Sequence, residues 1–202
     1  MKIAERIDRL GTETAFAGSA EAADFAAEGN KVYPFHLGDM NIITPAIVRE
    51  TAIKAMNAGK TGYCPNAGIP QLREILSADV SASRWIQYSM ENVAIQTGGK
   101  TTICKYIMAL MNPGDEVLYP NPGYPIYESQ IEFHGGTAVP YSYVEGKNNF
   151  EIDMEMIEKK ITPKTRLLIL NDLQNPTGAE CSAAEFEKLA DIVNKHNLFV
   201  LC

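Results

Sequence analysis

Residues 166–178 read RLLILNDLQNPTG, an apolar run followed at once by a polar loop that ends at Gly178. The uninterrupted apolar residues Leu167 to Leu170 are typical of a strand that is buried on both faces of a parallel sheet. In such sheets, ligands bind beyond the carboxyl ends of the strands. The stretch therefore predicts a central strand with a functional loop directly after it.

Strands and helices alternate along the rest of the chain after an amino-terminal segment, residues 1–36, that we expect to be irregular. Short apolar runs predict further strands at 93–95, 116–119, 137–143 and 198–202. Apolar residues at helical spacing predict helices at 45–59, 70–85, 100–111, 126–133 and 154–161, and a last helix after residue 182. This alternation predicts an α/β fold, a mainly parallel sheet with helices on both faces.

Two helix starts carry capping signals. Thr44 precedes Pro45, which predicts Thr as the N-cap and Pro at the first helical position. Ser182 is followed three residues later by Glu185, the spacing of a capping box.

The composition is that of an ordinary globular protein. The 202 residues are 46% hydrophobic and 21% charged, which argues against disorder and against a disulfide scaffold. A formal net charge of -7 argues against a nucleic-acid-binding surface, because phosphate binding needs clustered cations. We therefore expect small-molecule partners and no nucleic acid.

The cysteines and histidines show no spacing typical of a metal site, so no metal is predicted. The first ten residues, MKIAERIDRL, lack the apolar core of a signal peptide, and no apolar run reaches the roughly 18 residues of a membrane span. We expect a cytoplasmic protein with reduced thiols and no membrane partner.

The turn Thr97-Gly98-Gly99-Lys100-Thr101 joins a predicted strand to a predicted helix. Glycines at such a turn let the backbone approach a ligand, and the helix start favours an anion. Residues 94–101, AIQTGGKT, also fit a relaxed phosphate-loop pattern in which Ala replaces the first Gly. A nucleotide-binding loop, the phosphate site of another cofactor and a plain turn are therefore all open at this point.

Two further loops follow predicted strands at the same sheet edge. Pro122 and Pro125 stiffen the loop 121–125, NPGYP, which presents Tyr124, whose ring could stack on a planar group. Asn175, in the loop after the strand 166–170, offers both a donor and an acceptor for a phenolate or a carboxylate. Each loop alone is equally compatible with an ordinary turn.

Together and in this order, the three loops resemble the class I/II aminotransferases, the fold-type I pyridoxal-phosphate (PLP) enzymes similar to aspartate aminotransferase. The resemblance extends over almost the whole chain. It includes LGD at 37–39, TP at 44–45, GYCP at 62–65, GIPQLR at 68–73, PGDEV at 113–117, ITPKT at 161–165 and NPTG at 175–178.

The resemblance implies PLP as the cofactor and a role for each loop. Gly98, Gly99 and Lys100 match the loop whose backbone amides hold the cofactor phosphate. Tyr124 matches the aromatic residue stacked on the pyridine ring. Asn175 matches the amide that contacts the phenolic oxygen of the ring and the carboxylate side of the substrate.

Two more residues match family positions outside these loops. Gly38 matches the glycine beside the substrate carboxylate. Tyr63 matches the tyrosine that reaches the phosphate of the cofactor in the neighbouring subunit, which implies a homodimer with shared active sites.

The sequence also departs from the family pattern. Asp39-Met40-Asn41-Ile42 replaces the residues that commonly follow the glycine, which leaves substrate preference open, and Gln174 stands where Asn is common. The Schiff-base lysine, the ring-nitrogen aspartate and the carboxylate-binding arginine of the family match nothing in 1–202. We therefore expect no catalytic residue in this chain and an inactive 202-residue piece.

The resemblance also implies a division of the chain. Residues 1–44 are expected to form an amino-terminal arm and a segment of the small domain. Residues 45–202 are expected to form the PLP-binding large domain of a fold-type I enzyme, incomplete at its carboxyl end.

The implied function is a PLP-dependent aminotransferase of amino acid metabolism and biosynthesis, which transfers an amino group between an amino acid and a 2-oxo acid. A lyase, decarboxylase or synthase on the same cofactor would use the same visible residues, because fold does not fix chemistry. A phosphate-loop nucleotide-binding protein is the third alternative.

Overall fold

Four parallel strands form the central sheet of the computed structural model, which describes residues 2–11, 14–35, 38, 40, 42–147 and 149–202. The strands are β1 (Glu116–Pro120), β2 (Thr137–Tyr141), β5 (Thr165–Ile169) and β6 (Phe199–Leu201), in the order β2-β1-β5-β6. Leu118 of β1 is opposite Val139 of β2 on one side and Leu168 of β5 on the other. The predicted strands at 116–119, 166–170 and 198–202 are therefore confirmed, with bounds that differ by one residue.

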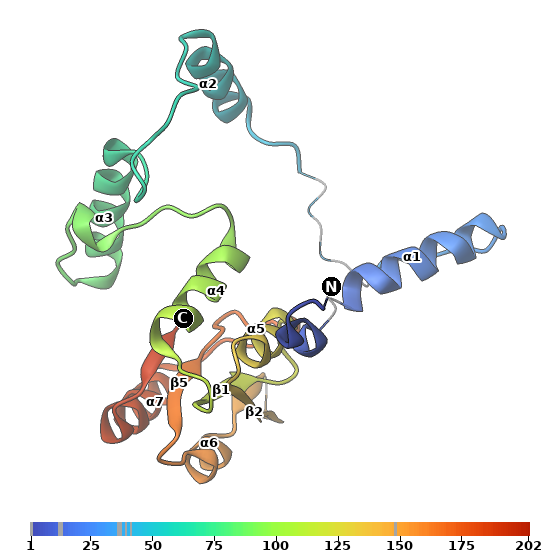
Figure 1. The fold of residues 1–202 in the computed structure, drawn as a ribbon, viewed down its shortest axis with the longest axis vertical. Coiled ribbons are helices and arrows are strands. Elements are labelled where there is room, and N and C mark those ends of the chain that lie inside the picture. The colour runs from blue at the N-terminus through green and yellow to red at the C-terminus, as the bar shows by residue number, and fades with distance from the viewer. Residues whose placement is uncertain (1, 12–13, 36–37, 39, 41, 148) are drawn as a thin grey trace. The chain divides into compact units, whose positions relative to one another are not determined.

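Helices cover both faces of this sheet because successive strand residues point to opposite sides. Val117, Leu167 and Ile169 pack with α4 (Gly99–Leu110) and α5 (Ile126–Phe133). Leu118 and Leu168 pack with α6 (Met154–Lys160) and α7 (Ala183–His196). Figure 1 shows the two helix pairs on opposite sides of the strands. The predicted α/β fold with helices on both faces is confirmed.

The strand order reverses between β1 and β5. After β1, the chain passes through α5 and forms β2 on one side of β1. The later strands β5 and β6 lie on the other side of β1. Ligands of open α/β sheets bind at such a reversal, beyond the carboxyl ends of the two strands. The loops after β1 and β5 are the ones that the sequence singled out.

The capping box at the start of α7 is confirmed. Ser182 Oγ accepts a hydrogen bond from the N–H of Glu185 at 3.3 Å, and Glu185 Oε2 accepts one from the N–H of Ser182 at 2.8 Å. Glu185 Oε1 also accepts from the N–H of Ile152 at 2.9 Å, which ties α7 to the end of β4 (Phe150–Ile152). The carboxylate therefore joins two elements that are separated in sequence.

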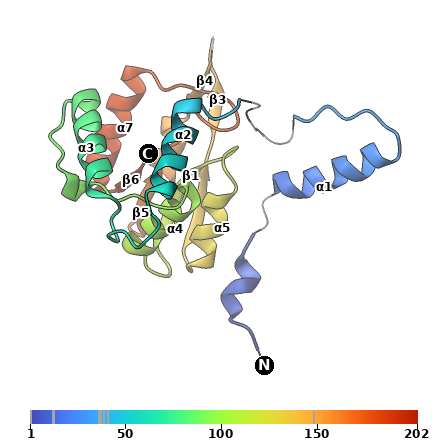
Figure 2. The ribbon, with the colours of Figure 1, turned by 90° about the horizontal axis from the view of Figure 1, so that it is seen from above.

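The structure corrects the region after β2. One strand was predicted over 137–143, but β2 ends at Tyr141, and β3 (Tyr143–Glu145) pairs with β4 (Phe150–Ile152) as an antiparallel hairpin outside the central sheet (Figure 2). The hairpin was missed because each of its strands has only three residues, too few to show a period.

The predicted strand at 93–95 is also wrong. These residues follow a short 3-10 helix, η2 (Met90–Asn92), and have no strand assignment. The N–H of Ile95 donates to the carbonyl of Ala67 at 2.8 Å, a loop residue, so the segment has no strand partner with which to form a ladder. The apolar run reflects packing against Gly68, where an added Cβ would lie 2.6 Å from Ile95 Cγ1.

Two expectations near the amino terminus need correction. Residues 1–36 were expected to be irregular, but they contain η1 (Glu5–Arg9) and α1 (Thr14–Ala27). Half of the α1 sequence, TAFAGSAEAADFAA, is alanine, the strongest helix former, and this propensity outweighed the weak apolar pattern. The helix expected to begin at Pro45 begins instead at Ala46, with Pro45 and not Thr44 as its N-cap, and no side-chain cap bond forms.

The chain divides into two compact units, Met1–Val32 with Lys100–Cys202, and Tyr33–Gly99. The second unit contains α2 (Ala46–Asn57), α3 (Pro70–Arg84) and η2. Within it, the buried Arg73 donates to the carbonyls of Val93 and Met90 at 2.8 and 2.7 Å, and so fixes the segment that leads to the turn 97–99. None of the helices described in the two units is long and apolar enough to cross a membrane.

Candidate functional site

The candidate site lies where the strand order reverses, at the carboxyl ends of β1 and β5. The loop after β1, residues 121–125, leads into α5, and the loop after β5, residues 170–182, leads into α7. Since β1 and β5 are hydrogen-bonded neighbours, the two loops start side by side. This placement brings the predicted ring-stacking residue and the predicted amide residue to one edge of the sheet.

Tyr124 is half-buried at the start of α5. Its ring packs edge-to-face on the ring of Tyr127, with centroids 5.8 Å apart and an angle of 89° between the planes. The Nζ atom of Lys100 lies 6.0 Å from the centroid of the Tyr124 ring. The structure therefore brings together the first turn of α4 and the aromatic residue that the sequence predicted for the cofactor ring.

Gly123 is a residue of this loop whose importance the sequence analysis missed. A Cβ atom at this position would lie 2.1 Å from the carbonyl oxygen of Pro120, well inside van der Waals contact. Only glycine lets the chain turn back so closely over the end of β1. The glycine is visible in the NPGYP sequence, but the carbonyl that it approaches follows from the fold.

Asn175 is exposed in the loop after β5, as expected of a ligand-binding amide. Its backbone N–H donates to Asn171 Oδ1 at 3.0 Å, so the loop begins with a turn closed by a side chain. This hydrogen bond holds the Asn175 backbone and leaves its own carboxamide on the surface.

Gln174, the residue before Asn175, is 1% exposed. Its Nε2 atom donates to the carbonyl of Pro122 in the loop after β1 at 2.6 Å. Its Oε1 atom accepts from the N–H and the hydroxyl of Thr177 at 3.0 and 2.6 Å. From the sequence alone, Gln174 is a mild departure from the family pattern, whereas in the structure it links the two loops.

Gly98 and Gly99 lie at the end of the Tyr33–Gly99 unit. Gly98 has a φ of +87°, the left-handed region that glycine adopts without strain, and Gly99 is the first residue of the 12-residue helix α4. No heavy atom lies within 4 Å of a Cβ built on either glycine. A helix that starts at such a turn favours an anionic group such as a phosphate at its first N–H groups.

Tyr63 and Gly38 belong to the same unit as Gly98. The side chain of Tyr63 is fully exposed, and a Cβ built on Gly38 meets no heavy atom within 4 Å. Leu37 and Asp39, which flank Gly38 in the family motif, lie outside the described residues. The roles of Tyr63 and Gly38 stay predictions.

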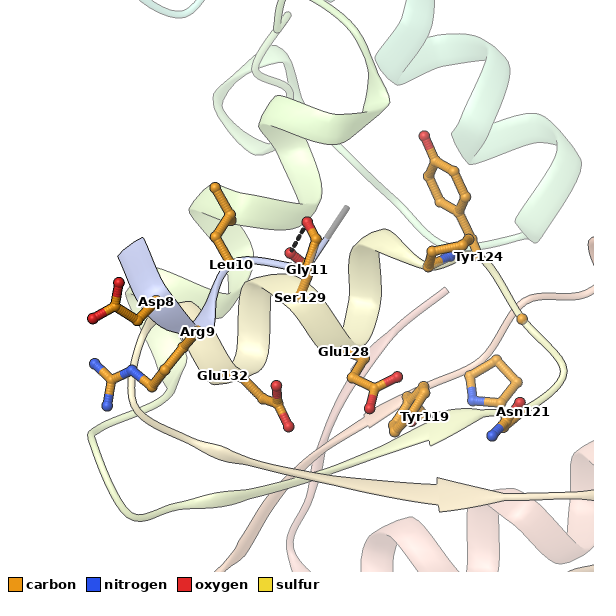
Figure 3. Close-up of a pocket in the computed structure, with 13 residues that line it drawn as sticks. Asp8, Arg9, Leu10, Gly11, Tyr119, Asn121, Tyr124, Glu128, Ser129 and Glu132 are labelled. Atoms are coloured by element: carbon orange, nitrogen blue, oxygen red, sulfur yellow. Dashed lines mark hydrogen bonds between the residues drawn. The ribbon is translucent and has the colours of Figure 1, made fainter. Parts of the chain in front are cut away.

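A cavity of about 500 Å³ is lined by residues of η1, of the end of β1 with the loop after it, and of α5 (Figure 3). Figure 3 shows Glu128 close to Tyr119, while the ring of Tyr124 points away from this pair. Burial, reinforced by Glu128, raises the pKa of Tyr119 far above its ordinary value, so its hydroxyl stays neutral. Tyr124 lines this cavity, whereas Lys100 and Asn175 do not, so the cavity adjoins the candidate cofactor site at Tyr124.

Comparison with known proteins decides the family. The sequence model of the family described as "Aminotransferase class I and II" matches residues 32–202. The chain belongs to the class I and II aminotransferases.

Relatives within this aminotransferase family match over nearly the full chain. The aspartate aminotransferase of Geobacillus stearothermophilus is 32% identical over 100% of this chain and 51% of its own length. The aspartate/prephenate aminotransferase of Thermus thermophilus is 30% identical over 98% of this chain and 51% of its own length. This chain therefore spans about half the length of the curated relatives that it matches.

Solved aminotransferase structures share the fold. The aspartate aminotransferase from Thermus thermophilus with maleate superimposes with a TM-score of 0.92 at 30% identity, over 99% of this chain and 52% of that one. The alanine aminotransferase from Pyrococcus furiosus gives a TM-score of 0.92 at 25% identity, over 98% of this chain and 51% of that one. Because the chain belongs to this family, the phosphate-loop interpretation of residues 94–101 loses its support.

Proposed function

We propose that residues 1–202 supply the cofactor-binding part of a PLP-dependent aminotransferase, which transfers an amino group between an amino acid and a 2-oxo acid. The observation that carries the proposal is the meeting of Lys100, Tyr124 and the loop of Asn175 at the reversal of strand order, in a chain of this family. Each of these residues has the chemistry that a phosphorylated aromatic ring requires.

Backbone N–H groups at Gly98, Gly99 and Lys100 would hold the cofactor phosphate at the start of α4. The positive φ of Gly98 and the helix start at Gly99 support this role. The helix dipole adds to the attraction, and each anion at a helix start typically gains about 0.3–1 kcal/mol. The Lys100 ammonium contributes charge near the Tyr124 ring.

Tyr124 and Asn175 would hold the ring. Tyr124, fixed edge-on against Tyr127, presents its ring as a stacking surface that also keeps water from one face of the cofactor. The exposed Asn175 carboxamide would donate to the phenolic oxygen and set the rotation of the ring within its plane. When bound, PLP supplies an electron sink that withdraws electrons from the substrate Cα.

Gly38 and Tyr63 extend the proposal to the substrate and to a second subunit. A glycine at position 38 would let the substrate carboxylate approach the backbone. The fully exposed Tyr63 is suited to contact the cofactor phosphate of a partner, in a homodimer with shared active sites. We place the enzyme in the cytoplasm, with residues 1–44 as arm and small-domain segment and 45–202 as large domain.

Relatives named for aspartate and prephenate suggest which substrates to test first. We propose aspartate as the first amino donor to assay, with alanine as the comparison, since a structural relative is an alanine aminotransferase. Amino transfer to a 2-oxo acid without other products supports an aminotransferase. Loss of carbon dioxide or elimination from the same amino acids would favour a decarboxylase or a lyase.

Cofactor binding is the direct test. The full-length protein that carries these 202 residues should gain visible absorbance with PLP, and borohydride reduction should fix the cofactor to a lysine outside 1–202. A purified full-length protein that stays colourless with excess PLP would contradict the proposal.

Lys100→Ala separates this function from nucleotide binding. In a phosphate loop, the lysine amine contacts the nucleotide phosphates, so its loss should abolish ATP binding. In the aminotransferase, backbone N–H groups carry most of the contact, and we expect PLP affinity to fall tenfold or less, about 1.4 kcal/mol. Titrations of the parent and the variant with PLP and with ATP give the answer, and saturable, Lys100-dependent ATP binding would overturn the assignment of this loop.

A further inference from the structure

Gln174 joins the two loops of the candidate site. Its carboxamide donates through Nε2 to the carbonyl of Pro122 in the loop after β1, although the two residues are 52 positions apart in sequence. Among the residues that the structure describes, this is the hydrogen bond that connects 121–125 with 171–179. The Gln174 side chain therefore couples the position of the loop after β1 to that of the loop after β5.

The rest of Gln174 is anchored within its own loop. Oε1 accepts from the N–H and the hydroxyl of Thr177. The backbone N–H donates to the carbonyl of Ala179 at 2.8 Å, and the N–H of Gly178 donates to the carbonyl of Gln174 at 2.6 Å. The side chain itself is 1% exposed, so its amide atoms depend on these protein partners rather than on water for their hydrogen bonds.

This position needs a side chain with both a donor and an acceptor. Pro122 offers only a carbonyl, whereas Thr177 offers an N–H and a hydroxyl, so an amide satisfies both sides at once. A carboxylate would place an acceptor against the Pro122 carbonyl. An apolar side chain of the same size would remove the hydrogen-bond partner that Gln174 gives to the Pro122 carbonyl and to the Thr177 N–H.

We infer that Gln174 is a positioning residue, which sets the distance between Tyr124 and Asn175 so that both contact one cofactor ring. This inference rests on the proposed function. Tyr124 is two residues after the Pro122 carbonyl and Asn175 is one residue after Gln174, so the bond acts within a few atoms of both groups. Binding groups must be held to about 0.5 Å for full effect, and supporting hydrogen bonds provide this accuracy.

Two substitutions at Gln174 and one at Thr177 test the inference in the full-length protein. Gln174→Leu removes all side-chain hydrogen bonds, and Gln174→Glu keeps the acceptor toward Thr177 but loses the donor toward Pro122. Thr177→Val removes the hydroxyl within the loop and leaves the bond to Pro122. The exposed Gln87, on a loop of the other unit, gives the matched control Gln87→Leu.

The first measurement is hydrogen exchange of the cofactor-free protein. We expect exchange in a peptide spanning 117–130 to accelerate at least tenfold in Gln174→Leu and Gln174→Glu, and less than threefold in Thr177→Val and Gln87→Leu. Acceleration spread evenly over the chain would show that Gln174 serves only global stability, and unchanged exchange at 117–130 would show that it does not join the loops. Either result overturns the inference, and Gln174→Glu, which matches Gln in size, keeps the test open if the Leu variant does not fold.

The second measurement is the dissociation constant of PLP, from titration of the same cofactor-free proteins. We expect it to rise at least tenfold in both Gln174 variants, with a shifted absorbance maximum of the bound cofactor, and to stay within twofold in Gln87→Leu. If the parent binds PLP and the Gln174 variants bind equally well, the inference is wrong and the proposed function stands. If the parent does not bind PLP, the proposed function is wrong, and with it the role toward the cofactor, while the exchange data still decide whether Gln174 joins the loops.

Discussion

The two faces of the central sheet are built from neighbouring residues of the same strands but support different parts of the protein. On one face, Leu118 and Leu168 pack against α6 and α7. On the other face, Val117 and Ile169 pack against α4 and α5. The helices of the second face begin directly at the predicted phosphate turn and at Tyr124, whereas α7 begins at its own capping box, seven residues beyond Asn175.

Equally buried residues on the two faces should therefore differ in how their substitution affects cofactor binding. Substitutions on the α6 and α7 face should lower stability alone. Substitutions on the α4 and α5 face should lower stability and also move the groups that we propose for the cofactor.

The largest effect is expected for a pair of core truncations in β5. Leu168 and Ile169 are 0% and 1% exposed and face opposite sides of the sheet. Leu168→Ala and Ile169→Ala should each reduce the free energy of unfolding by about 2–5 kcal/mol, because each leaves a cavity. Chemical denaturation of the cofactor-free full-length protein measures this loss.

The PLP affinities of the same two variants test whether the two faces of the sheet differ in their effect on the cofactor site. PLP titrations at a temperature where both variants are folded should show weaker binding in Ile169→Ala and parent-like binding in Leu168→Ala. Equal weakening in the two variants would mean that the faces do not differ in their link to the site.

Asn175→Ala tests the loop after β5. A hydrogen bond to a charged partner is worth about 1.5–3 kcal/mol, so PLP affinity should fall by roughly ten- to a hundredfold. The exposed position predicts an unchanged melting temperature of the cofactor-free protein. Asn194→Ala, an exposed asparagine of α7, serves as the control, and a drop of many degrees in Asn175→Ala alone would make Asn175 a structural residue.

Tyr124→Leu tests the stacking surface at the start of α5. Loss of an aromatic pair should cost about 0.5–1.5 kcal/mol beyond buried area, which weakens PLP binding by about two- to tenfold. Tyr124→Phe keeps the ring and should bind PLP nearly as the parent does. If Tyr124→Phe is as weak as Tyr124→Leu, the hydroxyl and not the ring face is what the cofactor needs.

The smallest effect is expected on the α7 side, at Glu185. Burial opposes ionisation of this carboxyl, but hydrogen bonds from the backbone N–H groups of Ser182 and Ile152 outweigh it and hold its pKa below the ordinary value. A pKa lowered by folding stabilises the fold above the pKa of the unfolded chain, and the contribution is lost as the pH falls through the folded pKa. Glu185→Gln should therefore lower the free energy of unfolding by about 1 kcal/mol at pH 7, with no change in PLP affinity.

The pH dependence of the stability of Glu185→Gln tests the direction of the pKa shift at Glu185. The stability difference between the parent and Glu185→Gln should shrink as the pH falls below about 4, where the carboxyl of the unfolded chain becomes protonated. The exposed Glu187 of the same helix provides the control Glu187→Gln. A difference that grows on acidification would contradict the assigned direction of the pKa shift.

Local sequence patterns predicted most elements of the fold correctly. The helix α5 was predicted with its observed bounds, and the capping box of α7 was predicted to the residue. The errors fall where local patterns are weak. The hairpin strands are three residues long, the apolar run 93–95 packs in a loop, and α1 forms from alanine propensity without a strong apolar stripe.

The sequence by itself determined which residue types follow each strand, because strand, turn and helix signals are local. The order of these loop motifs along the chain also pointed to the family. It also identified Tyr124 and Asn175 as the groups suited to a planar, oxygen-bearing ligand. Only the tertiary structure decided the strand order β2-β1-β5-β6, and with it the fact that these two loops are neighbours. It alone assigned Gln174 its bond to Pro122 and Gly123 its approach to Pro120. Such contacts join segments through packing, and periodicity along the chain contains no information about which segments will meet.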